Sequence, residues 1–527
     1  MDKNNLPIYL SIAVVFGLLI GTFLNRDNSI IIAKSTSSEL KIKKLIKYIQ
    51  SDYVDKVNTD KLLDEAIAQM LSKLDPHSVY IPKENLQLIT EGMQGNFVGI
   101  GIHFKIIDDS ITVVEPIKGG PSYKKGIKAG DRILIANNDT LYGKNIKSEQ
   151  ILHKLKGKPE TVVKLQVYRK VNDSLFNINI SREKVNIKSV DISYMLSKNT
   201  GYIKLDRFAR NTYTEFKSAL NHLLSQGMKT LILDLRENGG GFIDIANKIV
   251  DEFLSDNTLI VYTKDNKGSV KKSFASQKGS FENGELYVLI NENSASASEI
   301  VAGALQDNDR GIIVGRRSFG KGLVQQEIDL GDGSAARLTT ARYYTPTGRS
   351  IQKPYKRNQD IKNYQNVLEE RYKNGELFNK DSIKINDSLQ YKTPKGKVVY
   401  GGGGIIPDVF VPIDTSAYLP SFLFIPLNNF AFNYVDNNRS ELTSLNLDEF
   451  IKNFDIDKEI LNKFLAKLKN FRASKKNKEL IKKRLKTLIA RELFNDEGLY
   501  KLRQEDDKMI QKVLDLENKG DAQAKTL

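Results

Sequence analysis

Short apolar runs alternate with helical patterns between residues 201 and 306. The apolar runs have the length and composition of buried strands and lie at 201–205, 230–235 and 286–290. Apolar positions at helical spacing follow each run, at 213–226, 242–254 and 298–306. Strands that alternate with helices in this way predict an α/β domain.

The preceding region, 92–184, consists of short strand patterns broken by glycine. Strands are expected at 96–105, 110–115, 162–168 and 175–180, and a short helix at 148–155. A hairpin with two glycines is one interpretation of Gly99-Ile100-Gly101-Ile102. The other is a loop whose backbone N–H groups converge on an anion beside a strand edge that can pair with a peptide.

A second turn, Lys128 to Leu134 (KAGDRIL), follows this loop after about 30 residues. The loop and the turn, in this order, resemble those of a PDZ domain. The resemblance implies that Gly99, Ile100, Gly101 and Ile102 bind the terminal carboxylate of a peptide.

The segment Leu6 to Leu24 contains 19 residues without a charge. That length can cross the hydrocarbon core of a membrane as an α-helix. A cleaved signal peptide is the alternative, but Asn25-Arg26-Asp27 follows in place of a small-residue cleavage site. We therefore expect one uncleaved anchor in the inner (cytoplasmic) membrane, with the bulk of the chain outside the cytoplasm, in the cell envelope.

Composition excludes several kinds of site. The chain has no cysteine, so thiol catalysis, disulfides and zinc–thiolate sites are excluded. Its four histidines, His77, His103, His153 and His222, form neither HExxH nor a close pair, so we expect no metal and interpret each as a surface or packing residue. The net charge of +16 reflects lysine that is abundant throughout, so no nucleic-acid partner is expected.

The densest chemical signal lies at Asn291 to Gln326, NENSASASEIVAGALQDNDRGIIVGRRSFGKGLVQQ. Ser296 falls at a strand-to-helix turn, beside free backbone N–H groups and the positive end of a helix dipole. A tetrahedral oxyanion would be stabilised there. The alternative is structural, because Ser296 and Glu299 also fit a helix capping box.

Lys321 stands between Gly320 and Gly322, after an apolar strand at 311–315. A lysine can act as a general base when burial or another cation lowers its pKa. The two segments resemble the S-A-S-A-S-E and F-G-K-G-x-V-Q motifs of the C-terminal processing peptidases, or tail-specific proteases. The resemblance implies that Ser296 is the nucleophile, that Lys321 is its base, and that Gln325 orients the lysine.

A third segment, Asp234 to Phe242 (DLRENGGGF), is similar to that family's D-L-R-x-N-x-G-G-x. Here Asn238-Gly239 replaces the commoner Asn-Pro. The resemblance implies an oxyanion hole made by the N–H of Ala297 and that of Gly240 or Gly241. Matches at 74–78, 344–349 and 402–409 extend the resemblance over roughly residues 38–412.

The segment from Gly315 to Lys321 also fits a phosphate-binding G-x-x-x-x-G-K loop. The next residue, Gly322, lacks the hydroxyl that would bind magnesium, and the following LVQQEIDLGDG alternates as a strand does. We therefore reject a P-loop and expect no cofactor.

These observations predict a mixed α/β (α+β) multidomain protein. Its parts are an anchor at 1–34 (span about 6–24), a helical module at 35–91, a PDZ domain at 92–184, a peptidase core at 185–412 with a polar insertion at 352–400, and a basic helical extension at 413–527.

The expected function is that of an envelope serine endopeptidase that binds free C-terminal tails of protein substrates and cuts peptide bonds by a Ser–Lys mechanism. The alternative is a catalytically silent, membrane-anchored PDZ adapter. Serine, lysine and glutamine together favour the enzyme. The apolar stripes of the C-terminal helices are candidates for homo-oligomer formation or for binding an adaptor protein.

Overall fold

The computed structural model describes residues 36–143, 147–276, 278–355, 364, 366–416, 418–468 and 471–518. The predicted anchor at 6–24 lies outside these residues. Within the described part, no helix combines the length and the apolar character needed to cross a membrane. The chain divides into two compact units, Met1–Met70 and Leu71–Leu527. In the first unit, α2 (Ser37–Asp52) and most of α3 (Thr59–Ser72) confirm the two predicted helices.

The peptidase core is built on a six-stranded sheet of order β10-β11-β12-β15-β16-β21. The strands from β11 to β21 pair in parallel, and β10 is antiparallel to β11. The predicted alternation of strands and helices is confirmed. The bounds are β10 (Val190–Met195), β11 (Thr200–Leu205), β12 (Thr230–Asp234), β15 (Glu285–Ile290), β16 (Ile312–Gly315), β21 (Val409–Phe410), α7 (Thr212–Ser225), α8 (Ile243–Asp251) and α9 (Ala297–Asp307).

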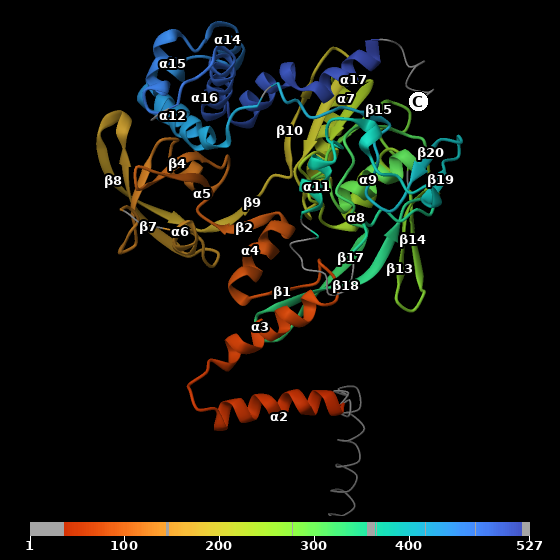
Figure 1. Ribbon diagram of the computed structural model, residues 1–527. Helices are drawn as coiled ribbons and strands as arrows, with labels where there is room; N and C mark the ends of the chain where they lie inside the picture. Colours follow the sequence, from red (N-terminus) through yellow and green to blue (C-terminus); the bar gives the residue numbers. More distant parts are fainter. Residues whose placement is uncertain are drawn as a thin grey trace, which may run out of the picture. The chain divides into compact units, whose positions relative to one another are not determined.

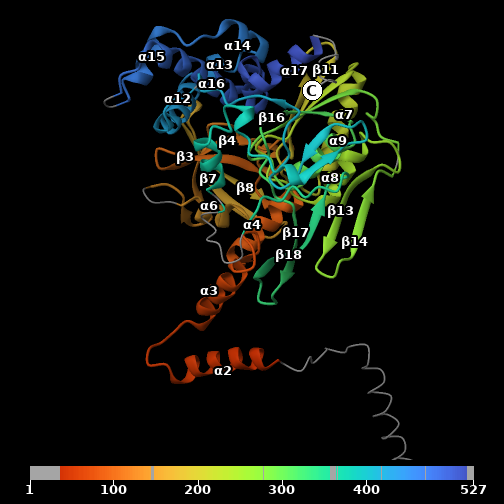
Figure 2. The same ribbon diagram turned by 45° about the vertical axis from the view of Figure 1, so that its right-hand side comes forward.

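Helices cover both faces of this sheet. Alternate strand residues such as Ile203, Leu233 and Val288 pack against α7, α8 and α9. The residues between them face α17 (Lys508–Asn518), which belongs to the C-terminal extension and packs by Met509 and Val513. Both views show α17 beside the core strands (Figures 1 and 2). The last described helix therefore completes the hydrophobic core of the peptidase.

A second sheet, which the sequence patterns did not predict, has the order β1-β18-β13-β14, with β17 also paired to β18. The β17–β18 hairpin directly follows Lys321, and β1 brings the segment around residue 78 against β18. This sheet therefore joins three distant segments near the predicted base. Its strands are β1 (Val79–Ile81), β13 (Leu259–Asp265), β14 (Val270–Phe274), β17 (Leu323–Asp329) and β18 (Ala335–Tyr344).

The PDZ region follows α4 (Lys83–Gln94) and contains a sheet of order β3-β4-β5-β7-β8, with β6 paired to β5. The strand predicted at 96–105 is divided at the Gly99–Gly101 turn into β2, which pairs with β9, and β3. Strand β3 lies at the edge of the sheet. The elements are β2 (Asn96–Gly99), β3 (Ile102–Ile107), β4 (Ser110–Pro116), α5 (Pro121–Lys124), β5 (Arg132–Ala136), β6 (Asp139–Thr140), α6 (Ser148–Leu155), β7 (Val162–Arg169), β8 (Ser174–Ser181) and β9 (Glu183–Asn186).

The C-terminal helices form a domain with a hydrophobic core of its own. Its charged face meets the PDZ domain, where the Asp436 carboxylate accepts hydrogen bonds from Arg132 at 2.7 and 3.0 Å and from Lys170 at 3.1 Å. Glu492 pairs with Lys105 at 2.6 Å. In these ion pairs the acidic partner comes from the C-terminal domain and the basic partner from the PDZ domain. The helices are α12 (Phe424–Asn437), α13 (Arg439–Leu442), α14 (Leu447–Asn453), α15 (Lys458–Leu465) and α16 (Lys475–Arg503).

We expect Asp436→Asn to lower the free energy of unfolding by about 2 kcal/mol, because it leaves the nearly buried Arg132 without its counter-charge. Urea denaturation of the full chain measures this loss. The matched control is Glu183→Gln, which removes an exposed ion pair with Lys124 on the same PDZ domain and should change stability little. Equal losses of unfolding free energy in the two variants would show that Asp436 stabilises the fold no more than an exposed ion pair does.

Candidate active site

Ser296 occupies the turn between strand β15 and helix α9, as predicted. Its backbone has φ 56° and ψ −112°, a region that non-glycine residues rarely adopt and that commonly marks functional sites. Half of the predicted capping box is present: the Glu299 carboxylate accepts the Ser296 N–H at 2.9 Å, whereas the Ser296 side chain makes no capping hydrogen bond. The same turn can therefore both cap the helix and carry a catalytic serine.

Lys321 lies in the loop between β16 and β17. Its Nζ donates to Oε1 of Gln325 at 2.9 Å, and Nε2 of Gln325 donates to the His77 carbonyl at 2.6 Å. Burial and the nearby Arg337 guanidinium lower the pKa of Lys321, while Glu299 and Asp75 oppose the shift. A lysine shifted in this direction is more readily neutral, as a general base must be.

Two buried side chains join the backbones of Ser296 and Lys321. Oε2 of Glu299 accepts the N–H of Ser296 at 2.9 Å and that of Lys321 at 2.8 Å. The Tyr343 hydroxyl donates to the carbonyl of Ser296 at 3.1 Å and to that of Lys321 at 2.7 Å. The structure therefore brings the predicted nucleophile and base into one site.

The glycine segment after β12 lies directly against the Ser296 turn. A Cβ on Gly240 would come within 2.8 Å of the Ser296 Cβ and 2.9 Å of the Ala297 nitrogen. The Gly240 N–H donates to Oδ1 of Asn238 at 2.9 Å. By contrast, the N–H groups of Ala297 and Gly241 have no hydrogen-bond partner in the part of the chain that the structure describes. This favours Gly241 over Gly240 as the second oxyanion donor.

His77 was interpreted from the sequence as a surface or packing residue, and that interpretation missed its place beside the base. The Asp75 carboxylate accepts the N–H groups of His77 and Ser78 at 2.8 and 2.9 Å, and this turn aims the His77 carbonyl at Gln325. Burial, assisted by Lys321, lowers the pKa of His77 to about 4, so its ring is neutral. The matched segment 74–78 was the only signal for this contact in the sequence.

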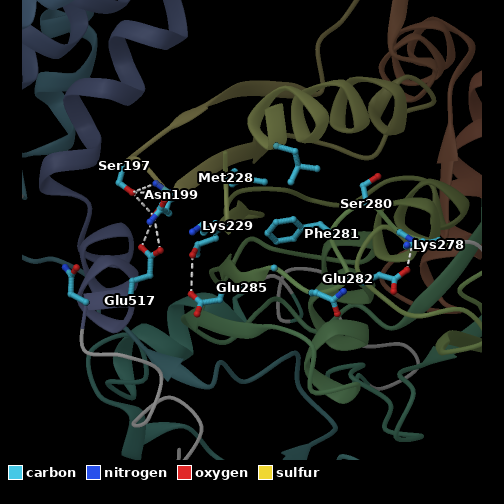
Figure 3. A pocket seen from close by; sticks show the side chains of 17 residues that line it. Ser197, Asn199, Met228, Lys229, Lys278, Ser280, Phe281, Glu282, Glu285 and Glu517 are labelled. Atoms are coloured by element: carbon cyan, nitrogen blue, oxygen red, sulfur yellow. Dashed lines mark hydrogen bonds between the residues drawn. The ribbon is translucent and has the colours of Figure 1, made fainter. Parts of the chain in front are cut away.

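The core also has a hollow that lies away from this site. A hollow of about 850 Å³ lies at the opposite, amino ends of β11, β12 and β15. Figure 3 shows the polar side chains Ser197, Glu285 and Glu517 around it. Glu517 accepts a hydrogen bond from Thr200 at 2.8 Å, so this hollow is bordered by the contact between α17 and the core.

Comparisons with known proteins show the family of the chain. Peptidase family S41 matches residues 199–362, and the PDZ domain matches residues 98–180. A probable CtpA-like serine protease of Staphylococcus aureus (strain N315) is 34% identical over 344 residues, which cover 64% of this chain and 68% of that protein. The carboxy-terminal-processing protease of Bartonella bacilliformis is 37% identical over 313 residues, covering 58% and 71%. The chain belongs to the S41 family of C-terminal processing peptidases.

This S41 peptidase is therefore a serine-type peptidase with a PDZ domain. The N-terminal domain of the activating protease CtpB matches residues 25–85, and a family of unknown function matches 426–495. Among solved structures, the photosystem II D1 C-terminal processing protease shares 29% identity over 60% of this chain and 84% of that chain, with a TM-score of 0.35.

The insertion at 352–400, expected to be polar and irregular, contains ordered elements that support the lysine loop. Arg371 donates to the carbonyls of Arg317 and Ser318 at 2.9 and 3.0 Å. Lys353 lies 3.8 Å from the centroid of the Phe319 ring. The insertion thus packs on the segment that leads to Lys321. Its elements include α11 (Val367–Lys373), β19 (Gln390–Lys392) and β20 (Val398–Tyr400).

The predicted carboxylate loop lies in the PDZ domain, apart from the peptidase residues. Gly101 has φ +72°, which lets the backbone turn between β2 and β3. Ile102 and Phe104 of β3 pack on a core that includes Ile151 and Leu155 of α6. The edge of β3 and these apolar side chains are thus adjacent, as a site for an extended apolar peptide requires.

We expect Gly240→Ala to reduce kcat/KM on the order of 100-fold, because the added Cβ would displace the Ser296 turn. Gly239→Ala is the matched control, since a Cβ there meets nothing within 4 Å. Peptide cleavage by the two folded variants tests this directly. Near-wild-type activity of Gly240→Ala would show that the close approach is unimportant.

The pH dependence of kcat/KM should follow Lys321. Activity requires the neutral amine, so kcat/KM rises as pH increases through the pKa of Lys321. Arg337→Gln removes a neighbouring positive charge, so it should raise that pKa and move the acidic limb to higher pH. Arg342→Gln, on the same strand, should leave the limb in place. A shift of equal size in both variants would count against Lys321 as the titrating base.

Proposed function

We propose that this S41 peptidase is an envelope endopeptidase that binds protein C-terminal tails through its PDZ domain and hydrolyses peptide bonds with Ser296 and Lys321. The observation that carries the proposal is the convergence on one site of a strained serine turn and a lysine whose pKa is lowered by burial. Ser296 and Lys321 share two buried partners there, Glu299 and Tyr343.

In the proposed mechanism, neutral Lys321 takes the proton of the Ser296 hydroxyl as the oxygen attacks the scissile carbonyl carbon. The N–H groups of Ala297 and Gly241 bind the oxyanion. The tetrahedral intermediate collapses, and the leaving amine takes the proton from the Lys321 ammonium. Lys321 then deprotonates a water molecule that hydrolyses the acyl-enzyme, which releases the carboxylic acid and restores Ser296. Gln325 orients the lysine throughout.

For substrate recognition, we propose that the loop at 99–102 receives the terminal carboxylate while the edge of β3 pairs with the peptide backbone. The apolar neighbours of β3 favour an apolar last residue. A silent PDZ adapter, the alternative, has no use for a catalytic trio, and the S41 relationship also favours an enzyme.

The envelope location is part of the proposal and rests on the uncharged segment Leu6 to Leu24. We propose that it anchors the chain in the inner membrane and that the peptidase lies outside the cytoplasm. Recovery of the full-length protein in the membrane fraction, together with its digestion by a protease added to the outside of intact spheroplasts, supports this. Recovery in the cytosol contradicts it.

The decisive test compares wild type, Ser296→Ala and Lys321→Ala on two peptides that differ only in an apolar or a charged last residue. We expect each substitution to reduce cleavage of the apolar-tailed peptide by about 1000-fold or more, because the nucleophile or its base is lost. Binding of that peptide should be unchanged in Ser296→Ala. Near-full proteolysis by Lys321→Ala would refute the dyad, and equal handling of the two peptides would refute tail recognition.

A further inference from the structure

We propose that Glu299 and Tyr343 are positioning residues, which hold the nucleophile and the base in register by binding both of their backbones. This inference rests on the proposed Ser296–Lys321 mechanism and adds two residues that act through the dyad without touching the substrate. Ser296 and Lys321 are 25 positions apart (321 minus 296) and belong to different loops, so their relative position requires such a connection.

Glu299 binds the N–H side of both residues. Its side chain is fully buried, and Oε2 accepts from Ser296 and Lys321 while Oε1 accepts from the Gly320 N–H at 2.6 Å and the Ser318 hydroxyl at 2.5 Å. The four donors thus occupy both acceptor positions on each of the two Glu299 carboxylate oxygens. An amide in this place would turn its NH₂ group toward two of those donors.

Tyr343 binds the carbonyl side. Its side chain is buried, and its single hydroxyl proton is shared between the carbonyl oxygens of Ser296 and Lys321. The two dyad residues are therefore joined on both sides of their backbones, by an acceptor at the N–H groups and by a donor at the carbonyl groups.

Simpler roles do not account for these contacts. A role in capping explains only the hydrogen bond that the Ser296 N–H donates to Glu299. Three further groups donate to Glu299, and they belong to Ser318, Gly320 and Lys321 of the lysine loop. A buried tyrosine requires one hydrogen-bond partner, yet Tyr343 contacts the carbonyls of both dyad residues. A backbone strained at Ser296 also persists only where several contacts determine it.

The two residues differ in charge, and this makes their roles separable. The Glu299 carboxylate raises the pKa of Lys321 against the effect of burial. Burial raises the pKa of Glu299 itself to about 7, and its four donors limit that rise. Glu299→Gln removes both the charge and the titration, so the acidic limb of kcat/KM should move to lower pH. Tyr343→Phe removes no charge and should leave that limb in place.

The experiment uses the full chain with Glu299→Gln and Tyr343→Phe. The matched controls are Glu292→Gln, which removes a carboxylate that pairs with Arg316, and Tyr344→Phe, which alters the neighbouring tyrosine stacked on Tyr262. Readouts are thermal unfolding, kcat and KM across pH, and the rate at which a small fluorophosphonate labels Ser296. Ser296→Ala serves as the reference for the proposed mechanism.

We expect kcat and the labelling rate to fall on the order of 100-fold in Glu299→Gln and tenfold in Tyr343→Phe, with KM little changed. Glu299→Gln should also unfold at a lower temperature, because its NH₂ group faces two buried donors. Wild-type kcat and labelling in folded Tyr343→Phe overturn the inference for Tyr343, and the same result in folded Glu299→Gln overturns it for Glu299. If Glu299→Gln does not fold, Tyr343→Phe alone decides. An active Ser296→Ala variant would instead refute the mechanism, which separates the two failures.

Discussion

The active site depends on one buried carboxylate, that of Glu299, which has no cation as a direct partner in the described structure. A buried charge is unfavourable unless hydrogen bonds replace its hydration. Here four donors from two loops do so, namely the Ser318 hydroxyl and the backbone N–H groups of Ser296, Gly320 and Lys321. The start of α9, the Ser318 hydroxyl and the Lys321 turn are thereby assembled around a single group. Displacing any one of them would leave a donor or the carboxylate unsatisfied.

The rest of the core brings these parts to the carboxylate. Strand β15 of the first sheet leads to the Ser296 turn, whereas the second, antiparallel sheet carries Gln325 and Tyr343 and receives the Asp75 turn. Arg371 and Lys353 of the insertion pack on the same lysine loop. Distant segments therefore meet at the base and keep the lysine buried. Within the residues that the structure describes, its Nζ pairs with Gln325 and with no carboxylate.

The C-terminal extension links peptide recognition to the catalytic core. Helix α17 covers one face of the core sheet, and Asp436 binds Arg132 at the AGD turn of the PDZ domain. The sequence suggested a separate basic tail, because amphipathic stripes indicate that helices pack but not what they pack on. Only the fold shows that one end of this extension belongs to the peptidase core.

Sequence alone determined the features that depend on neighbouring residues. Buried strands and helices from 200 to 307 and the Ser296 turn follow from local periodicity and capping. The PDZ loop and the candidates Ser296, Lys321 and Gln325 came from motifs that resemble those of known families. The tertiary structure decided what depends on contacts between distant residues. Glu299, expected only to cap α9, also holds the Lys321 loop. Tyr343 and the His77 carbonyl became visible as partners only when the second sheet, which pairs the distant strands β1 and β13 with β18, placed them beside the dyad.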